Sequence, residues 1–288
     1  MLICFRGVKM KKISLIFIFL ATIALLFGCV GENAGFSQEA TLPENSVGDG
    51  TDGTQNVSPG DTESSEEEDV SAGEFEQPDK NEVTYLLSVA DGLNIRQEPS
   101  AQSASLGHID KGDMVGFYGE TEGWYKTFYC GKEAYVKKEY CELFVMEKGD
   151  EAVERVIEVG VKLLGTPYVY GAVRYHDGEG NLLKGFDERR FDCSSFTQYM
   201  YYIGAGVCLD LTTRTQILQG TSVDDVQRGD LMFFTNASRK NLTGIERVGH
   251  VALYLGDGYI LHTASDYAVI EKISATRQSY FISANRYL

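Results

Sequence analysis

Basic residues are scarce in this 288-residue chain, and that scarcity excludes one broad class of function. There are 26 Lys and Arg against 42 Asp and Glu, which gives a formal net charge of −16. Proteins that bind nucleic acid need clustered Lys and Arg, so we expect no nucleic-acid partner. Hydrophobic residues still make up 43% of the chain, which excludes a wholly disordered protein.

Metal-binding clusters are also missing from the sequence. No Cys-x-x-Cys motif occurs, and the chain has only four His residues, His108, His176, His250 and His262. A zinc site built from Cys193, His250 and His262 has three ligands, whereas a structural zinc site usually takes four. We therefore expect neither a metal nor another cofactor.

Long hydrophobic runs are limited to residues 13–27, directly after Lys11 and Lys12. This run is shorter than the roughly 20 residues that span a membrane, and a basic start before a short apolar run is typical of a secretory signal. Gly28-Cys29 then resembles the bacterial lipoprotein box. That resemblance implies cleavage before Cys29, a lipid on its sulfur, and an exported lipoprotein anchored to the outer face of the cell membrane. An ordinary signal peptide or an uncleaved anchor is the alternative.

Most of the negative charge lies in residues 29–82, which hold 15 acids and one base, Lys80. Gly, Ser and Thr fill much of the remainder, and apolar residues are too sparse to offset the entropy of ordering the chain. We predict a disordered acidic linker here. The predicted organisation is a lipoprotein signal peptide at 1–28, this linker at 29–82, and folded domains at 83–147 and 148–288.

Residues 83–147 alternate short apolar and polar stretches between glycines, which is typical of a small all-β barrel. LNIR at 93–96, GWYK at 123–126 and AYV at 134–136 follow one another as in a bacterial SH3-like domain, which this segment resembles. The resemblance implies binding to cell-wall peptidoglycan, or a steric barrier beside a catalytic domain. We predict that Trp124, the only Trp, packs in the barrel core.

Residues 148–288 show helical periodicity first and strand patterns afterwards. Apolar residues recur at three- and four-residue steps over 151–164, which predicts a helix. A second helix should follow Asp192, a suitable N-cap, and end near Gly204. The predicted strands are residues 231–234, 251–255, 259–261 and 269–270, with a GDG hairpin turn at 256–258. Helices followed by an antiparallel sheet indicate an α+β fold.

Cys193 is the residue best placed to act as a nucleophile. It follows Asp192 at a predicted helix start, and both a helix N-terminus and a nearby imidazole lower a thiol pKa from about 8.5. His250 lies at the start of the predicted strand that contains 251–255, and His262 lies at the end of the one that contains 259–261, so the hairpin can place the two imidazoles side by side. A nucleophile, a base and an orienting polar group are the parts of a catalytic triad.

Five short motifs surround these residues. They are GTPY at 165–168, FDCS at 191–194, RGDL at 228–231, GHV at 249–251 and LH at 261–262. In order and spacing they resemble the NlpC-type cell-wall cysteine peptidases. The resemblance implies a papain-like α+β domain with a central antiparallel sheet, and hydrolysis of the bond from γ-D-Glu to diaminopimelate or Lys in peptidoglycan stem peptides. By position it implies Cys193 as nucleophile, His250 as base and His262 as the residue that orients this base.

The same resemblance assigns roles to three neighbours of the nucleophile. Tyr168 matches a tyrosine beside the catalytic Cys and would help to stabilise the oxyanion. Asp192 and Ser194 match residues that help to hold the substrate, so the predicted partner is peptidoglycan or a muropeptide. Residues 173–190 form an insertion, which either borders the cleft or is a solvated hairpin.

Several alternatives stay open at this point. The same fold can serve a non-catalytic peptidoglycan-binding lipoprotein, or an amidase that cuts the muramoyl-L-alanine bond. Cys130 and Cys141 either pair as a disulfide across the end of the barrel or remain as buried thiols.

Overall fold

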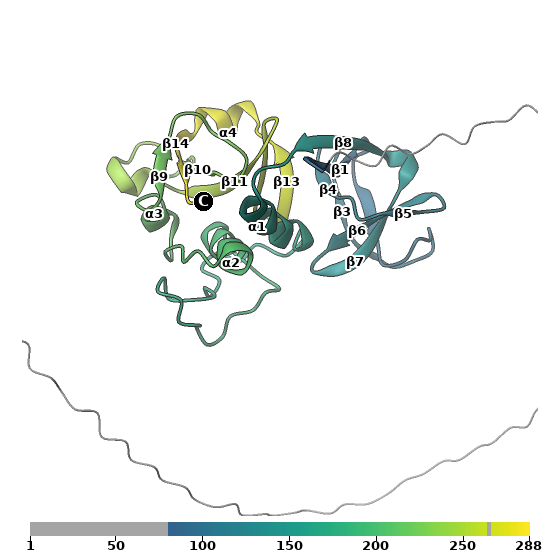
Figure 1. The fold of residues 1–288 in the computed structure, drawn as a ribbon, viewed down its shortest axis with the longest axis horizontal. Helices are drawn as coiled ribbons and strands as arrows, with labels where there is room; N and C mark the ends of the chain where they lie inside the picture. The colour runs from purple at the N-terminus through teal and green to yellow at the C-terminus, as the bar shows by residue number, and fades with distance from the viewer. Residues whose placement is uncertain (1–79, 264–265) are drawn as a thin grey trace, which may run out of the picture. The chain divides into compact units, whose positions relative to one another are not determined.

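The computed structural model describes residues 80–263 and 266–288, and it has the predicted α+β fold with mostly antiparallel sheets (Figure 1). The predicted signal peptide, the predicted lipidation site Cys29 and the predicted linker as far as residue 79 lie outside the described residues. Within the described ranges, no helix is both long and apolar enough to cross a membrane.

The barrel, residues 82–147, consists of short strands. They are β1 (Glu82–Ser88), β2 (Leu93–Arg96), β3 (Ser105–Ile109), β4 (Met114–Gly116), β5 (Glu120–Thr121), β6 (Trp124–Tyr129), β7 (Lys132–Lys137) and β8 (Cys141–Glu147), with the 3-10 turn η1 (Lys138–Tyr140) before β8. Strands β3, β2, β7, β6 and β5 form one antiparallel sheet. Trp124, predicted to pack in the core, is buried at 9% exposure.

The second part of the chain contains the longer helices. Its elements are α1 (Glu151–Lys162), α2 (Cys193–Ala205), α3 (Thr213–Gln216), β9 (Thr221–Val223), β10 (Leu231–Phe234), η2 (Gly244–Arg247), β11 (His250–Gly256), β12 (Tyr259–Thr263), β13 (Ala268–Lys272), α4 (Ala275–Ser279) and β14 (Phe281–Arg286). The predicted hairpin turn joins β11 to β12, and all three of its residues have positive φ. Strands β9 and β14 and the short helices α3 and α4 were not predicted.

Three barrel strands, β8, β1 and β4, also continue the sheet of the second part. The strand order is β8-β1-β4-β13-β12-β11-β10-β14-β9. The junction lies between β4 and β13, where Met114 pairs with Ile270. Arg228 adds a polar contact, because its guanidinium donates to the Tyr85 hydroxyl at 2.8 Å and to Glu154 at 2.6 Å. The two predicted folded units therefore share one sheet and one hydrophobic core.

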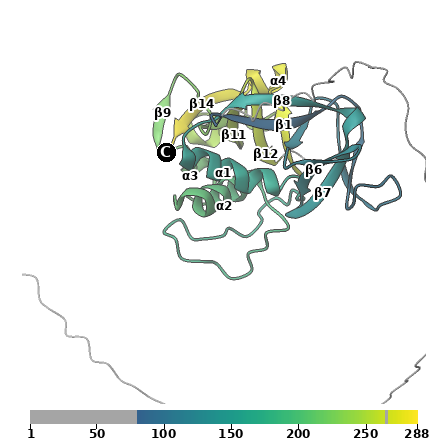
Figure 2. The same ribbon diagram turned by 45° about the vertical axis from the view of Figure 1, so that its right-hand side comes forward.

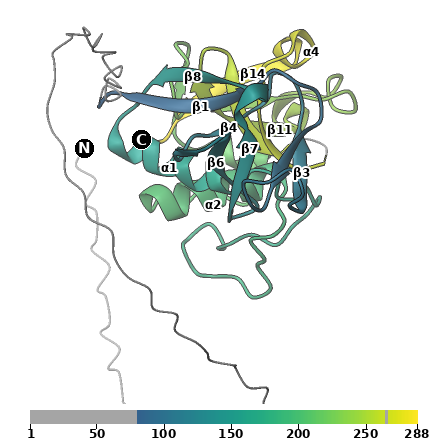
Figure 3. The ribbon, with the colours of Figure 1, turned by 90° about the vertical axis from the view of Figure 1, so that its right-hand side faces the viewer.

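Helices α1 and α2 pack side by side on one side of this sheet, and α4 lies on the other (Figures 2 and 3). The close approach of α1 and α2 depends on Gly204, since a Cβ there would lie 2.5 Å from the Cα of Val156. Helix α2 also contacts β11 and β12. This packing brings the first residue of α2, Cys193, to the beginning of β11, near the backbone N–H of Val251, which lowers the pKa of its thiol.

The described cysteines are all free thiols. The disulfide considered between Cys130 and Cys141 is therefore not formed. The alternative of two buried thiols is also wrong, because Cys130 is exposed and Cys141 is only half-buried. Cys130 lies at a turn with φ of 52°.

Candidate active site

The first turn of α2 holds the predicted nucleophile. Asp192 is the N-cap: its carboxylate accepts a hydrogen bond from the backbone N–H of Ser195 at 2.8 Å, and the Ser195 hydroxyl accepts one from the Asp192 N–H at 2.8 Å. This capping box starts the helix at Cys193 and places the thiol at the positive end of the helix dipole. The Cys193 side chain is buried, with 9% exposure.

The Asp192 carboxylate is also held by groups outside the helix. The Arg174 guanidinium lies 2.9 Å from Oδ2, the Gly171 N–H donates to the same oxygen at 3.1 Å, and the Ser194 hydroxyl donates to Oδ1 at 3.1 Å. Arg174 also donates to the Ser194 hydroxyl at 2.8 Å. Arg174 belongs to the insertion at 173–190, so this end of the insertion borders the site. Direct contact of Asp192 and Ser194 with substrate stays a prediction.

Two adjoining cavities contain most of the predicted site residues. The nucleophile cavity, about 460 Å³, is lined by residues that include Tyr168, Arg174, Asp192, Cys193 and Ser194. The base cavity, about 500 Å³, is lined by residues that include Tyr168, Thr235, His250, Thr263 and Arg277. Tyr168, Asn236 and Gly249 line both cavities, so the two cavities meet along these residues.

A chain of hydrogen bonds, here called the relay, runs from His250 into the protein. His250 Nε2 lies 2.9 Å from His262 Nδ1, and His262 Nε2 lies 3.1 Å from Glu271 Oε1. Arg277 donates to the same Glu271 oxygen at 3.0 Å. The first three residues lie on the adjacent strands β11, β12 and β13, so the sheet sets their spacing. His262 is fully buried.

The proton positions in the relay follow from its acidic end. Burial alone would raise the pKa of Glu271, but the hydrogen bonds and charges of His262 and Arg277 outweigh burial and lower it. Glu271 is therefore a carboxylate, which can only accept hydrogen bonds. His262 Nε2–H donates to it, and His250 Nε2–H donates to the unprotonated Nδ1 of His262. This leaves His250 Nδ1 with a free lone pair, so Nδ1 is the nitrogen that can take a proton.

Burial keeps both the base and the nucleophile uncharged in the resting site. Burial lowers the pKa of His250 well below its usual value, and His262 and Arg277 lower it further. Burial likewise raises the pKa of the Cys193 thiol to about 12, with Asp192 adding to the rise. The sequence-based expectation of a lowered thiol pKa is wrong here, because burial and the Asp192 carboxylate outweigh the N–H groups at the helix start.

An uncharged Cys193 thiol beside an uncharged His250 predicts how the alkylation rate of Cys193 depends on pH. We expect alkylation of Cys193 by iodoacetamide to accelerate continuously from about pH 6 to about pH 10, since the thiolate fraction keeps rising below a pKa of about 12. Mass spectrometry of the Cys193 peptide measures the rate, and exposed Cys130 serves as the comparator in the same digest. A plateau near neutral pH would indicate a preformed thiolate–imidazolium pair and contradict the prediction.

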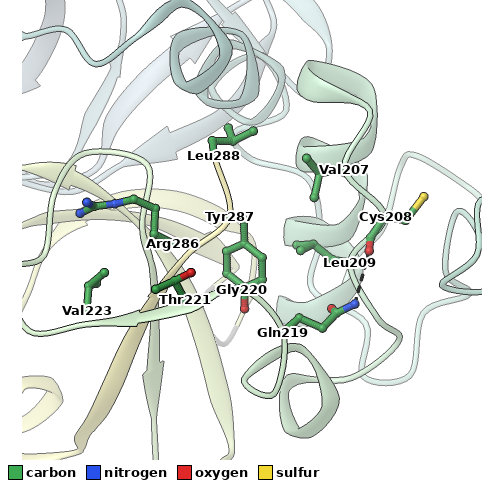
Figure 4. Close-up of a pocket in the computed structure, with 10 residues that line it drawn as sticks. All are labelled: Val207, Cys208, Leu209, Gln219, Gly220, Thr221, Val223, Arg286, Tyr287 and Leu288. Atoms are coloured by element: carbon green, nitrogen blue, oxygen red, sulfur yellow. Dashed lines mark hydrogen bonds between the residues drawn. The ribbon is translucent and has the colours of Figure 1, made fainter.

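A further cavity, about 610 Å³, lies among residues that include Cys208, Gln219, Arg286 and Leu288 (Figure 4). Its Arg286 is paired with Asp230 at 2.8 Å, and Gln219 donates to the Cys208 carbonyl at 3.5 Å. None of the predicted site residues lines this cavity. We therefore place the candidate reaction site in the nucleophile and base cavities.

The structure brings the described candidate residues together. Tyr168, Asp192, Cys193, Ser194 and His250 line the two cavities, and His262 lies directly behind His250. Cys29 lies outside the described residues. Within residues 80–263 and 266–288, no group of three or more His, Cys, Asp and Glu side chains is arranged to hold a metal ion.

Sequence reasoning missed Arg174, Glu271 and Arg277. For Glu271 a signal was available, because it directly follows the apolar run 269–270, a predicted strand next to the one that carries His262. An acid on a strand beside a buried His is a natural orienting partner. Arg174 and Arg277 lie in an irregular insertion and in a short unpredicted helix, where no periodic pattern indicates which side chains face the site.

Comparison with known families covers both parts of the described chain. Residues 91–142 match the family described as bacterial SH3 domain, and residues 165–286 match the NlpC/P60 family. Residues 165–286 are therefore similar to an NlpC/P60 domain. The resemblances to a bacterial SH3-like domain and to the NlpC-type peptidases are thereby confirmed, and the NlpC/P60 match spans the described candidate residues and the whole relay.

Two curated relatives match part of this chain. Peptidoglycan DL-endopeptidase CwlO of Bacillus licheniformis is 34% identical over 130 residues, which cover 43% of this chain and 25% of CwlO. A gamma-D-glutamyl-L-lysine dipeptidyl-peptidase of Bacillus cereus is 31% identical over 142 residues, which cover 48% of this chain and 37% of that protein. The chain thus spans less than two-fifths of the length of either relative.

Solved structures with the NlpC/P60 domain are similar at lower identity. An NlpC/P60 family protein from Bacillus cereus is 24% identical, with a TM-score of 0.39 over 72% of this chain and 64% of that chain. RipD from Mycobacterium tuberculosis, described as a non-catalytic NlpC/p60 domain protein adapted to peptidoglycan binding, is 24% identical, with a TM-score of 0.37 over 49% of this chain and 100% of RipD.

Proposed function

We propose that this chain is a cysteine peptidase that hydrolyses peptidoglycan stem peptides at the bond between γ-D-Glu and the following diamino acid. One observation carries the proposal: a buried thiol at a helix start lies in a cavity adjoining that of His250, whose Nδ1 is left as the free base by the relay. The names of the two curated relatives support the choice of substrate and bond.

The first half of the proposed reaction forms a thioester. Cys193 Sγ bonds to the carbonyl carbon of γ-D-Glu while its proton passes to His250 Nδ1. The backbone N–H groups at the start of α2 and the Tyr168 hydroxyl stabilise the oxyanion. His250 then gives its proton to the leaving nitrogen, the C–N bond breaks, and the diamino acid departs with a free amine.

The second half releases the acyl group. A water molecule loses a proton to His250 Nδ1 and attacks the thioester, and the thiol regains that proton as the γ-carboxylate of D-Glu leaves. In both halves His250 passes through a positively charged form. The relay stabilises this form, because His262 transmits the negative charge of Glu271 to the His250 imidazole.

Digestion of purified muropeptides and free stem peptides, analysed by mass spectrometry, tests the proposal. We expect products with a new γ-D-Glu terminus and products with a new N-terminal diamino acid. Release of an intact stem peptide with a free L-Ala amine would instead indicate a muramoyl-L-alanine amidase. Retention on purified cell wall without any cleavage would indicate a non-catalytic binding protein.

We also propose that the chain is an exported lipoprotein anchored to the outer face of the cell membrane through Cys29. The basic start, the apolar run at 13–27 and Gly28-Cys29 support this proposal, and two or three acyl chains give durable anchoring where one chain does not. In cell fractionation, Cys29→Ser should shift the chain from the membrane to the soluble fraction. Cys4→Ser is the matched control and should stay with the membrane, whereas unchanged retention of Cys29→Ser would refute the anchor.

A further inference from the structure

The base cavity contains buried polar groups that no described residue satisfies. Thr235 Oγ1, Thr263 Oγ1 and Arg277 Nε are all buried without a hydrogen-bond partner among the described residues. Thr235 is 3% exposed and Thr263 is 1% exposed, and all three residues line this cavity. Buried polar groups are normally paired with protein, water or ligand, so three unsatisfied groups around one cavity indicate a binding site for a polar group.

This cavity lies on the leaving-group side of the bond that is cut. In the proposed reaction His250 gives a proton to the leaving amine, so that amine lies within hydrogen-bond reach of His250. The acyl part of the substrate is bonded to Cys193 and extends into the nucleophile cavity. The residue that supplies the leaving amine therefore occupies the base cavity.

Arg277 is the only Lys or Arg among the described residues that line the base cavity. Apart from Arg277 and His250, the described residues that line it have hydroxyl, phenol, amide or glycine side chains, and burial keeps His250 neutral. Arg277 uses one terminal nitrogen for Glu271 and stacks 5.9 Å from the ring centre of Phe234, while its Nε has no partner among the described residues. A guanidinium flanked by hydroxyls is well suited to bind a carboxylate.

We propose that Arg277, with the hydroxyls of Thr235 and Thr263, selects substrates whose leaving residue places a carboxylate in the base cavity. This inference rests on the proposed function. Diaminopimelate and Lys both carry an amine at the far end of the side chain, but only diaminopimelate carries a carboxylate there as well. Arg277 attracts that carboxylate and repels the bare ammonium of Lys, so the enzyme should prefer diaminopimelate.

The test compares kcat/KM for three synthetic peptides with amidated C-termini. They are L-Ala-γ-D-Glu-diaminopimelate, the same peptide amidated at its side-chain carboxylate, and L-Ala-γ-D-Glu-L-Lys. We expect the first to be cleaved about ten- to a hundredfold faster than the other two, the effect of one charge-assisted carboxylate contact. A Lys peptide with a free C-terminal carboxylate shows whether the α-carboxylate can occupy the base cavity instead. Cleavage of this peptide that is faster than cleavage of the amidated Lys peptide also supports the inference.

Variants show whether Arg277 is the source of the preference. In Arg277→Gln the ratio between the diaminopimelate and Lys peptides should fall to about one. Because Arg277 also contacts Glu271, cleavage of all substrates is expected to slow, but a uniform loss of rate leaves the ratio unchanged.

Thr235→Val removes an unsatisfied hydroxyl without touching Glu271 and should lower the ratio while cleavage of the Lys peptide persists. Gln278→Ala, exposed on the same short helix, is the matched control.

The outcomes separate the inference from the function on which it rests. Equal cleavage of the three amidated peptides by the wild type, with no gain from a free α-carboxylate, would overturn the carboxylate preference and leave the proposed reaction standing. An unchanged ratio in both Arg277→Gln and Thr235→Val would overturn the assignment to these residues. Absence of γ-D-glutamyl cleavage with every peptide would mean that the proposed function itself fails.

Discussion

Replacing Cys193 by Ala should reduce kcat for stem-peptide hydrolysis by about a thousandfold or more. Among the described residues, Cys193 is the only thiol that lines either cavity. The neighbouring hydroxyl of Ser194 cannot take its place, because Arg174 and Asp192 already hold it. Liquid chromatography of the released diamino peptide, followed by mass spectrometry, measures the rate.

The fold should survive this substitution, which makes the loss interpretable. The capping box that starts α2 uses Asp192 and Ser195 and does not involve the thiol, so circular dichroism of the variant should match that of the wild type. Cys208→Ala removes another free thiol, one that lines neither catalytic cavity, and should retain full activity. Cleavage that persists in Cys193→Ala would exclude Cys193 as the nucleophile.

Replacing Glu271 by Gln should lower kcat by about ten- to a hundredfold. His262 and Arg277 both donate to one carboxylate oxygen, Oε1, and an amide in this place presents either its oxygen or its NH₂ group to these two donors. If the amide nitrogen faces His262, then His262 must carry its proton on Nδ1. His250 then carries its own proton on Nδ1, which removes the lone pair needed to take the thiol proton.

The pH profile distinguishes this positioning role from simple damage to the fold. The hydrogen bond and charge of Glu271 raise the pKa of His262, which burial otherwise lowers. Because the hydrogen-bonded His250 and His262 titrate as a coupled pair, removing the carboxylate should move the acid limb of kcat/KM to lower pH while the plateau falls. Asp257→Asn removes one exposed negative charge from the adjacent hairpin turn and should change neither feature. A lower plateau without any shift of the limb would contradict the assigned role.

Local sequence patterns were sufficient to predict the elements that carry the nucleophile and the base. Asp192 caps α2 through contacts within one turn, and the GDG turn at 256–258 fixes the β11–β12 hairpin that brings His250 to His262. Such signals are contained within a few neighbouring residues. The pairing of Met114 with Ile270 has no comparable signal, because it joins distant segments that both have ordinary strand patterns.

The electrostatics of the site could not be predicted in the same way. The helix start next to Cys193 is visible in the sequence and suggests a lowered thiol pKa. Its effect depends on how deeply the sulfur is buried and where the Asp192 carboxylate points, which are properties of the packed structure. Glu271 and Arg277 likewise become part of the site only when β13 and α4 fold against β12 and β10.

In the proposed reaction, the shared sheet gives the barrel a part that does not require contact with substrate. Without the barrel, β13 would be an edge strand with unpaired backbone N–H and C=O groups, a surface prone to pairing with other chains. Glu271, the acidic end of the relay, directly follows Ile270, the residue of β13 that pairs with Met114. The barrel thus pairs with an otherwise open edge of the sheet and restrains the strand that carries Glu271.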